Sequence, residues 1–282
     1  MASILHVCDA DMIEFHRING NKTINFWRPS PSNRFSNFHL GDYLFFYVRL
    51  ANSKEKAIVG YGHLAKITSM SFNNMWNTYK EENGYASKKA FKEAIQRLNK
   101  DNIIPTKLTG LYLTEVAFFQ SPLFLSEIGI NISKRLESYC YLDKEDEQAT
   151  SKVLRYAEEV GQDLWTSMFD DRGGASFKQD ENIYLLKQTI IAQALVLSRK
   201  QEKKAWHLLQ DRGINVVNNI KYIGYHYEND NLTLYIAIIN EQNMPELMLG
   251  HALMLKAKLS KYFNVTIKFI CEDDSLQLND LI

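Results

Sequence analysis

The sequence predicts an α+β protein: an N-terminal β-barrel with inserted helices, followed by a smaller α/β sandwich domain. Three observations lead to this fold class. Aromatic and β-branched residues dominate 24–67, helical patterns interrupt the strands at 73–98, and helices alternate with strands beyond residue 182. At 282 residues the chain is also long for a single core, which favours two compact domains.

The strands and helices of the barrel come first. Three β-like runs, separated by turn-forming clusters, lie at 23–27, 42–50 and 57–67. A helix is expected over 73–82, stopped by the Asn-Gly pair that follows, and a second over 87–98, with Ser87 as its N-cap. A strand over 108–119 then returns the chain to the barrel. If the barrel closes, its first and last strands are neighbours.

The second half begins with a change in composition. Acidic residues from Asp143 open a predicted helix that runs to Leu164, and a Gly-Gly pair at 173–174 marks a flexible end. The expected domains are the barrel (1–141), a helical linker (142–174) and an α/β domain (175–282). Within this last domain we expect a long helix or helix pair, two strands, a helix and a final strand, at 182–210, 220–227, 232–239, 245–263 and 265–271.

Charge is balanced over the whole chain, with 33 Lys and Arg against 33 Asp and Glu. A net charge of zero removes the bulk attraction to phosphates, so any contact with nucleic acid must be local. Cys8, Cys140 and Cys271 are too scattered for a zinc site, and no metal or other cofactor is expected. The first residues lack a signal-peptide pattern and no apolar run reaches the roughly 18 residues of a membrane span, so we expect a cytoplasmic protein without a membrane partner.

Short motifs along the N-terminal half carry a family resemblance. They are Phe-Trp-Arg-Pro-Ser at 26–30, Leu-Gly-Asp leading into Phe-Phe-Tyr at 40–47, Ile-Val-Gly-Tyr-Gly at 58–62, and Trp76 with Glu-Asn-Gly at 82–84. On these residues the half resembles the PUA-like superfamily, which includes EVE, ASCH and SRA-type reader domains. It is similar to the N-terminal domain of bacterial HNH restriction endonucleases. The resemblance implies recognition of a base, including a modified one, with DNA favoured over RNA and a role in restriction or defence.

A reader that inspects one base must pull it from the stack, and it recovers that free energy through aromatic stacking and hydrogen bonds. The predicted base-binding pocket therefore combines rings with polar side chains: Trp27, Arg28, Ser30, Phe35, Phe38, Tyr61, Trp76 and Asn83. Arg28 and Arg34 are also predicted to hold flanking phosphates, because guanidinium groups bind them bidentately. Each ring could instead fill the core. For Trp27 the core and the pocket are equally expected, and for a helical residue such as Trp76 the core is the more frequent place.

The C-terminal half departs from the resemblance. It lacks the cysteines and the His, Asn, His set of the HNH nuclease, so no catalytic residue is carried over. Glu181, Glu228 and Asp230 form a loose acidic trio of the kind a metal-dependent nuclease needs, although a solvated turn is the simpler interpretation. Two alternatives to the reader stay open: such a nuclease, and a module that binds a small nucleotide or a protein. The C-terminal domain is expected to serve a homodimer or a partner contact.

Overall fold

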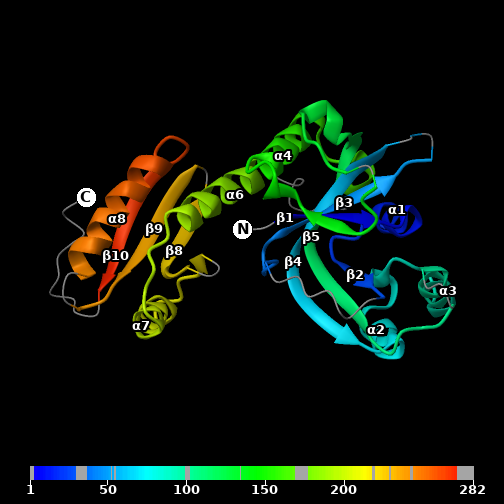
Figure 1. Cartoon of the computed structure of the whole chain (residues 1–282), viewed down its shortest axis with the longest axis horizontal. Coiled ribbons are helices and arrows are strands. Elements are labelled where there is room, and N and C mark those ends of the chain that lie inside the picture. Colours follow the sequence, from blue (N-terminus) through cyan, green and yellow to red (C-terminus); the bar gives the residue numbers. More distant parts are fainter. Residues whose placement is uncertain are drawn as a thin grey trace. The chain divides into compact units, whose positions relative to one another are not determined.

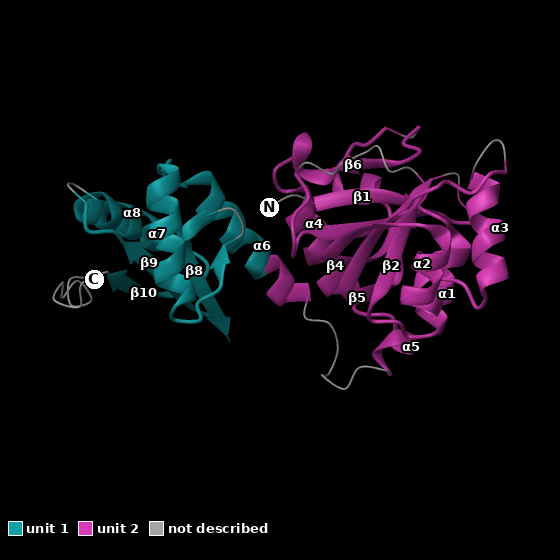
Figure 2. Cartoon of the chain, turned by 90° about the horizontal axis from the view of Figure 1, so that it is seen from below, with its two compact units in different colours: residues 1, 182–282 teal, residues 2–181 magenta. Residues whose placement is uncertain are grey.

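The computed structural model describes residues 3–29, 37–51, 53, 55–98, 102–133, 135–168, 177–217, 220–228, 230–241 and 244–271. The chain divides into two compact units, the N-terminal unit (2–181) and the C-terminal unit (182–282), which Figure 2 shows in two colours. Each unit combines helices with a β-sheet, so the expected mixed α+β class is confirmed.

The N-terminal unit is built on a six-stranded sheet in the order β2-β5-β4-β3-β1-β6 (Figure 1). Its strands are β1 (Ser3–Cys8), β2 (Ile24–Arg28), β3 (Tyr43–Arg49), β4 (Lys56–Met70), β5 (Leu108–Leu123) and β6 (Tyr139–Tyr141). β1 and β3 run parallel, and all other neighbours in this sheet are antiparallel.

The expected closed barrel is not found, because β2 and β6 form the two edges of the sheet in the described part of the chain. Register shifts between β4 and β5 mark bulges, which curl a sheet. The curl brings the ring of His6 on β1 within 4.6 Å of the ring of Phe26 on β2, measured between centroids. Side chains rather than a ladder of backbone hydrogen bonds therefore join β1 to β2.

Helices of the N-terminal unit pack on the outside of the sheet. They are α1 (Ala10–Ile18), α2 (Phe72–Tyr79), α3 (Lys88–Leu98), α4 (Ala149–Val160) and α5 (Leu164–Ser167), with short 3-10 turns η1 (Lys80–Asn83), η2 (Leu125–Ile128) and η3 (Leu142–Lys144). The helix expected from Asp143 begins only at Ala149, because the Asp143 carboxylate accepts hydrogen bonds from the backbone N and the hydroxyl of Thr150. It ends at Val160, where Gly161 takes a positive φ of 79°.

The C-terminal unit is a four-stranded sheet in the order β10-β9-β8-β7 with helices packed on it. The elements, beginning with a helix that starts in the N-terminal unit, are α6 (Phe177–Ala192), α7 (Arg199–Gln210), β7 (Val216–Val217), β8 (Ile220–Glu228), β9 (Asn231–Ile238), α8 (Met244–Leu259) and β10 (Asn264–Cys271). The expected helix pair over 182–210 is α6 and α7, and Ser198 caps α7 in a capping box with Gln201. Of the helices described, none has the length and apolar character to cross a bilayer.

Candidate functional site

Trp27 lies in a packed aromatic cluster formed by β2, α2 and α3. Only 5% of the residue is exposed, its ring meets that of Phe91 edge-on at 5.1 Å, and its Nε1 donates to the backbone O of Asn83 at 3.1 Å. Trp76, on α2, is half-buried and packs against the same Phe91 at 6.0 Å. The structure thus brings together three of the predicted residues, Trp27, Trp76 and Asn83, as packing around Phe91.

Asn83 fixes the end of α2 beside this cluster. Its Oδ1 accepts from Asn25 Nδ2 at 2.8 Å, and its Nδ2 donates to the backbone O of Lys80 at 2.8 Å. Lys80 has a positive φ of 45°, a conformation that costs a non-glycine residue on the order of 1–3 kcal/mol. The amide that was predicted to read a base edge is therefore engaged in holding a strained turn.

Arg28 lies on the opposite face of β2 from Trp27, since neighbouring residues of a strand point to opposite sides. It is buried, its Nη2 donates to Ser138 Oγ at 3.0 Å, and its guanidinium lies 5.0 Å from the centre of the Tyr139 ring. Burial lowers the pKa of Arg28. Burial, and then the positive charge of Arg28, lower the pKa of His6 to about 3. The predicted base-binding residues are thus divided between the two faces of β2.

Tyr61 belongs to a different cluster. It is fully buried, packs against Tyr43 at 5.7 Å, and donates its hydroxyl to the Asp180 carboxylate. Burial, followed by the neighbouring Asp180, raises the pKa of Tyr61. Phe38 is a core residue with 3% of its surface exposed. The remaining predicted residues, Ser30, Arg34 and Phe35, lie outside the described residues.

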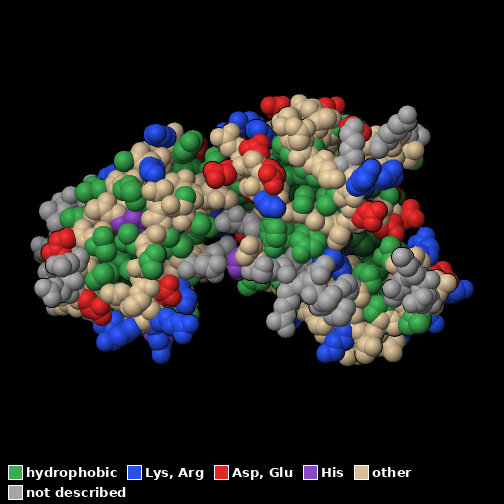
Figure 3. Space-filling view, viewed as in Figure 1, with side chains coloured by type: hydrophobic (Ala, Val, Ile, Leu, Met, Phe, Trp, Pro, Cys, Tyr) green, Lys and Arg blue, Asp and Glu red, His purple; other side chains and the backbone are tan. Residues whose placement is uncertain are grey.

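The outer side of α3, above the aromatic cluster, is basic. Lys88, Lys89, Lys92 and Arg97, called here the α3 basic face, are all exposed, and Figure 3 shows basic side chains around this helix. Within the described part of the chain none of the four has an ion-pair partner, and Glu93 is the only acidic residue of α3. Sequence reasoning had treated this helix only as an element of the fold, capped by Ser87. The i, i+3 and i, i+4 spacing of its lysines is the signal that it missed.

Two of these lysines stand where a helix disfavours them. Lys88 and Lys89 occupy the first turn of α3, next to the positive end of the helix dipole. Ser87 supplies the cap, its Oγ accepting from Ala90 N at 3.2 Å, and the Nζ of Lys88 lies 5.6 Å from the centre of the Phe72 ring. The helix dipole therefore does not explain cations at this end of α3.

A cleft of about 470 Å³ lies between α1, β3 and β5. Val48, Val59 and Phe118 contribute apolar lining. The charged lining consists of two cations and three carboxylates: Arg17, Arg49, Asp11, Glu14 and Asp163. Its volume falls in the range of small-molecule pockets, roughly 300–1,000 Å³. Arg49 is exposed and has no ion-pair partner among the residues described.

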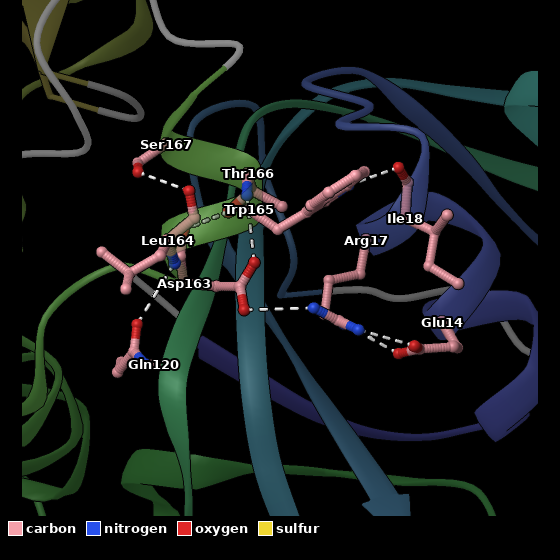
Figure 4. A network of polar contacts seen from close by, with 9 residues as sticks. All are labelled: Glu14, Arg17, Ile18, Gln120, Asp163, Leu164, Trp165, Thr166 and Ser167. Carbon is pink, nitrogen blue, oxygen red and sulfur yellow. Dashed lines mark hydrogen bonds and ion pairs between the residues drawn. The ribbon is translucent and has the colours of Figure 1, made fainter.

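Arg17 is the centre of a polar network at this cleft (Figure 4). Its Nε and Nη2 donate to Glu14 at 2.8 and 2.7 Å, and its Nη1 donates to Asp163 at 3.1 Å. Asp163 in turn caps α5 by accepting from Thr166 N at 3.0 Å. The two carboxylates raise the pKa of Arg17, chiefly through the Glu14 hydrogen bonds, and Arg17 lowers the pKa of Glu14. Arg17 therefore joins α1 to α5, and Arg49 is the cation available to a ligand.

The three acidic residues of the nuclease alternative are divided between the two units: Glu181 belongs to the N-terminal unit, and Glu228 and Asp230 belong to the C-terminal unit. Glu181 is buried and accepts from Arg155 Nη2 at 2.7 Å, while Asp230 accepts from the Tyr227 hydroxyl at 2.9 Å and Glu228 is exposed. Across the described ranges, no group of three His, Cys, Asp or Glu side chains is arranged to hold a metal ion.

Comparison with known proteins gives two negative results and one set of likenesses. No protein-family model matches the chain, and no curated protein matches it. Among solved structures it is similar to ASCH from Zymomonas mobilis, at 17% identity and a TM-score of 0.39 over 54% of this chain and 94% of that one. It is also similar to a hypothetical protein from Leishmania major, at 16% identity and a TM-score of 0.33 over 56% and 96%. ASCH is among the domain types of the sequence resemblance, but likenesses at this level do not establish a family.

Proposed function

We propose that this protein binds nucleic acid and that the α3 basic face contacts the phosphate backbone. One observation carries the proposal: four exposed cations without ion-pair partners in the described structure lie on one helix of a chain whose net charge is zero. Phosphate contacts supply most of the sequence-independent affinity for nucleic acid. A local basic surface is the arrangement that a neutral chain needs for them.

Reversing three of these charges tests the proposal. Lys88→Glu, Lys89→Glu and Lys92→Glu, combined in the full chain, should weaken binding to a labelled oligonucleotide by roughly tenfold or more. The slope of log affinity against log salt should also become less steep by about three, roughly one for each lost contact. Fluorescence anisotropy over a salt series measures both quantities.

The matched control reverses three exposed cations of the same unit away from α3: Lys66→Glu, Arg135→Glu and Lys144→Glu. The control and the α3 variant have the same net charge, so a difference in their affinities cannot come from bulk charge. Equal affinity and equal salt slope for the control and the α3 variant would contradict the proposal.

The finer predictions from the sequence and from its resemblance stay predictions. They are recognition of a modified base, DNA in preference to RNA, a role in restriction or defence, a homodimer formed by the C-terminal part, and the domain limits 1–141, 142–174 and 175–282. A base pocket at Trp27 needs that ring to leave its packing against Phe91. The first two predictions, a modified base and a preference for DNA, are tested by measuring binding to matched plain and modified oligonucleotides, each as DNA and as RNA.

The small-nucleotide alternative is favoured by the cleft beside Arg49, which has an apolar floor and one available cation. A nucleotide bound there would place its base on the apolar floor and a phosphate at Arg49. Calorimetry with mononucleotides tests this, using Arg49→Gln as the site variant and Lys66→Gln as the control. Absence of binding by the unmodified protein would rule it out.

A further inference from the structure

The outer side of α7, in the C-terminal unit, is also basic. Arg199, Lys200 and Lys203 are exposed, and together with Trp206 they are called here the α7 basic face. At 100° per residue these four positions fall within a single arc of the helix. The opposite side carries Ala205 and Leu209, which are fully buried in the core with β8 and β9. Figure 3 shows basic side chains gathered over this helix.

Other charges of α7 are tied to neighbouring elements. Lys204 Nζ lies 3.2 Å from Glu241 Oε1, and Glu202 Oε2 lies 3.6 Å from Lys221 Nζ. By contrast, Arg199, Lys200 and Lys203 have no ion-pair partner in the ranges that the structure describes. Lys200 nevertheless helps to lower the pKa of the Glu241 carboxyl, after Gln201 and Lys204, so the positive charge of the outer face is compensated only in part from within the unit.

Trp206 lies among these cations rather than in the core. It is 38% exposed, and its ring meets that of His207 at 5.0 Å. An exposed ring beside cations gives both contacts that an unpaired nucleotide offers: stacking for the base and charge for the phosphate. Such stacking tolerates any base, because every base has a π-face.

We infer that the α7 basic face is a second contact surface for nucleic acid and that it takes single-stranded segments. Arg199, Lys200 and Lys203 contact phosphates, and Trp206 stacks on an unpaired base. A membrane surface fits less well, because a membrane-bound amphipathic helix inserts its apolar side and that side of α7 is buried on the sheet. The choice of partner rests on the proposed function, whereas the surface itself does not involve α3.

Two variants of the full chain test the surface. Arg199→Glu with Lys203→Glu should lower affinity for a single-stranded oligonucleotide roughly tenfold and flatten the salt slope by about 1.4, or 0.7 per contact. Trp206→Ala should lower single-strand affinity by a similar factor while leaving duplex affinity unchanged, since duplex bases are already stacked. The controls are Lys258→Glu with Lys261→Glu, and Tyr262→Ala, all exposed positions of the same unit.

The outcomes separate this inference from the proposed function. Loss in the α7 variants alone supports the α7 surface and contradicts the role of α3. Loss in the α3 variant alone overturns the inference and leaves the function in place, and no binding by the unmodified protein removes both. An equal loss of oligonucleotide affinity in the α7 variants and in their controls overturns the inference. Tighter binding to phosphatidylserine vesicles or to polyglutamate than to the oligonucleotide also overturns it.

Discussion

The α3 and α7 basic faces use aromatic side chains in opposite ways. On α3 the cations lie outside, Phe91 and Trp27 are sealed in the core, and Phe72 and Trp76 are half-buried against Phe91. On α7 the cations surround an exposed ring, Trp206, and the residues that the helix itself buries, Ala205 and Leu209, are aliphatic. Two helices whose surface charge has the same sign thus offer different chemistry.

Under the proposed function, this difference predicts that the two faces contribute differently to binding. A face of cations alone contacts phosphates and does not distinguish paired from unpaired bases. A face that adds an exposed ring gains affinity where bases are unstacked. We therefore expect α3 to contribute to single strands and duplexes alike, and α7 to favour single strands.

The largest expected effect contrasts the two tryptophans. Trp27→Ala removes a buried ring and should lower the free energy of unfolding by about 3–5 kcal/mol. A base-stacking Trp27 in an open pocket would instead leave the fold intact and lose only binding when replaced. Trp206→Ala removes a half-exposed ring and should cost far less. Urea unfolding followed by circular dichroism measures both, and an unchanged stability for Trp27→Ala with lost binding would restore Trp27 as a base-stacking residue.

Acidic pH should weaken the N-terminal unit before the C-terminal unit. His6 and His16 are buried, and burial is the first cause that lowers the pKa of each to about 3. Between about pH 6.5 and pH 3 the unfolded chain therefore binds more protons than the folded one, so stability falls as pH falls. From pH 7 to pH 5 each histidine should remove about 2 kcal/mol.

Hydrogen exchange read by mass spectrometry resolves this pH effect by unit. The C-terminal unit has His251, whose pKa burial also lowers, and it lacks a second such histidine among the residues described. His16→Gln should reduce the pH dependence of the N-terminal unit by about half. Equal acid sensitivity in the two units, or no effect of His16→Gln, would show that other groups control it.

The smallest expected effect is a gain in stability from variants that bind less. Lys88 and Lys89 stand in the first turn of α3, and Arg199 and Lys200 in the first turn of α7. Replacing any of them with Glu places a favourable charge at the positive end of a helix dipole, which should stabilise by about 0.3–1 kcal/mol. Thermal unfolding at low salt measures the shift. A loss of stability in both helices would mean that these cations serve the fold rather than a partner.

The elements of this protein could largely be predicted from local sequence. The β-branched and aromatic runs predicted β2 to β5, the Ser87 cap predicted the start of α3, and the α6–α7 pair and the β8–β9 strands lie close to their expected ranges. The elements β1, α1 and β6 were not among the expected ones. The start of α4 was placed too early, because acidic residues near 143 read as a helix start while Asp143 bonds to Thr150 ahead of the helix. The lysines of the α3 and α7 basic faces are visible in the sequence, but only the structure shows that they are exposed on one side of each helix.

The sequence by itself determined most of the helices and strands, since these depend on residue spacing along the chain. The tertiary structure decided that the sheet curls without closing, that Trp27 and Arg28 point to opposite sides of β2, and that Trp206 stays outside. Strand pairing, burial and exposure depend on segments that are distant in the chain. A local pattern therefore cannot distinguish an aromatic ring that fills a core from one that is open to a ligand.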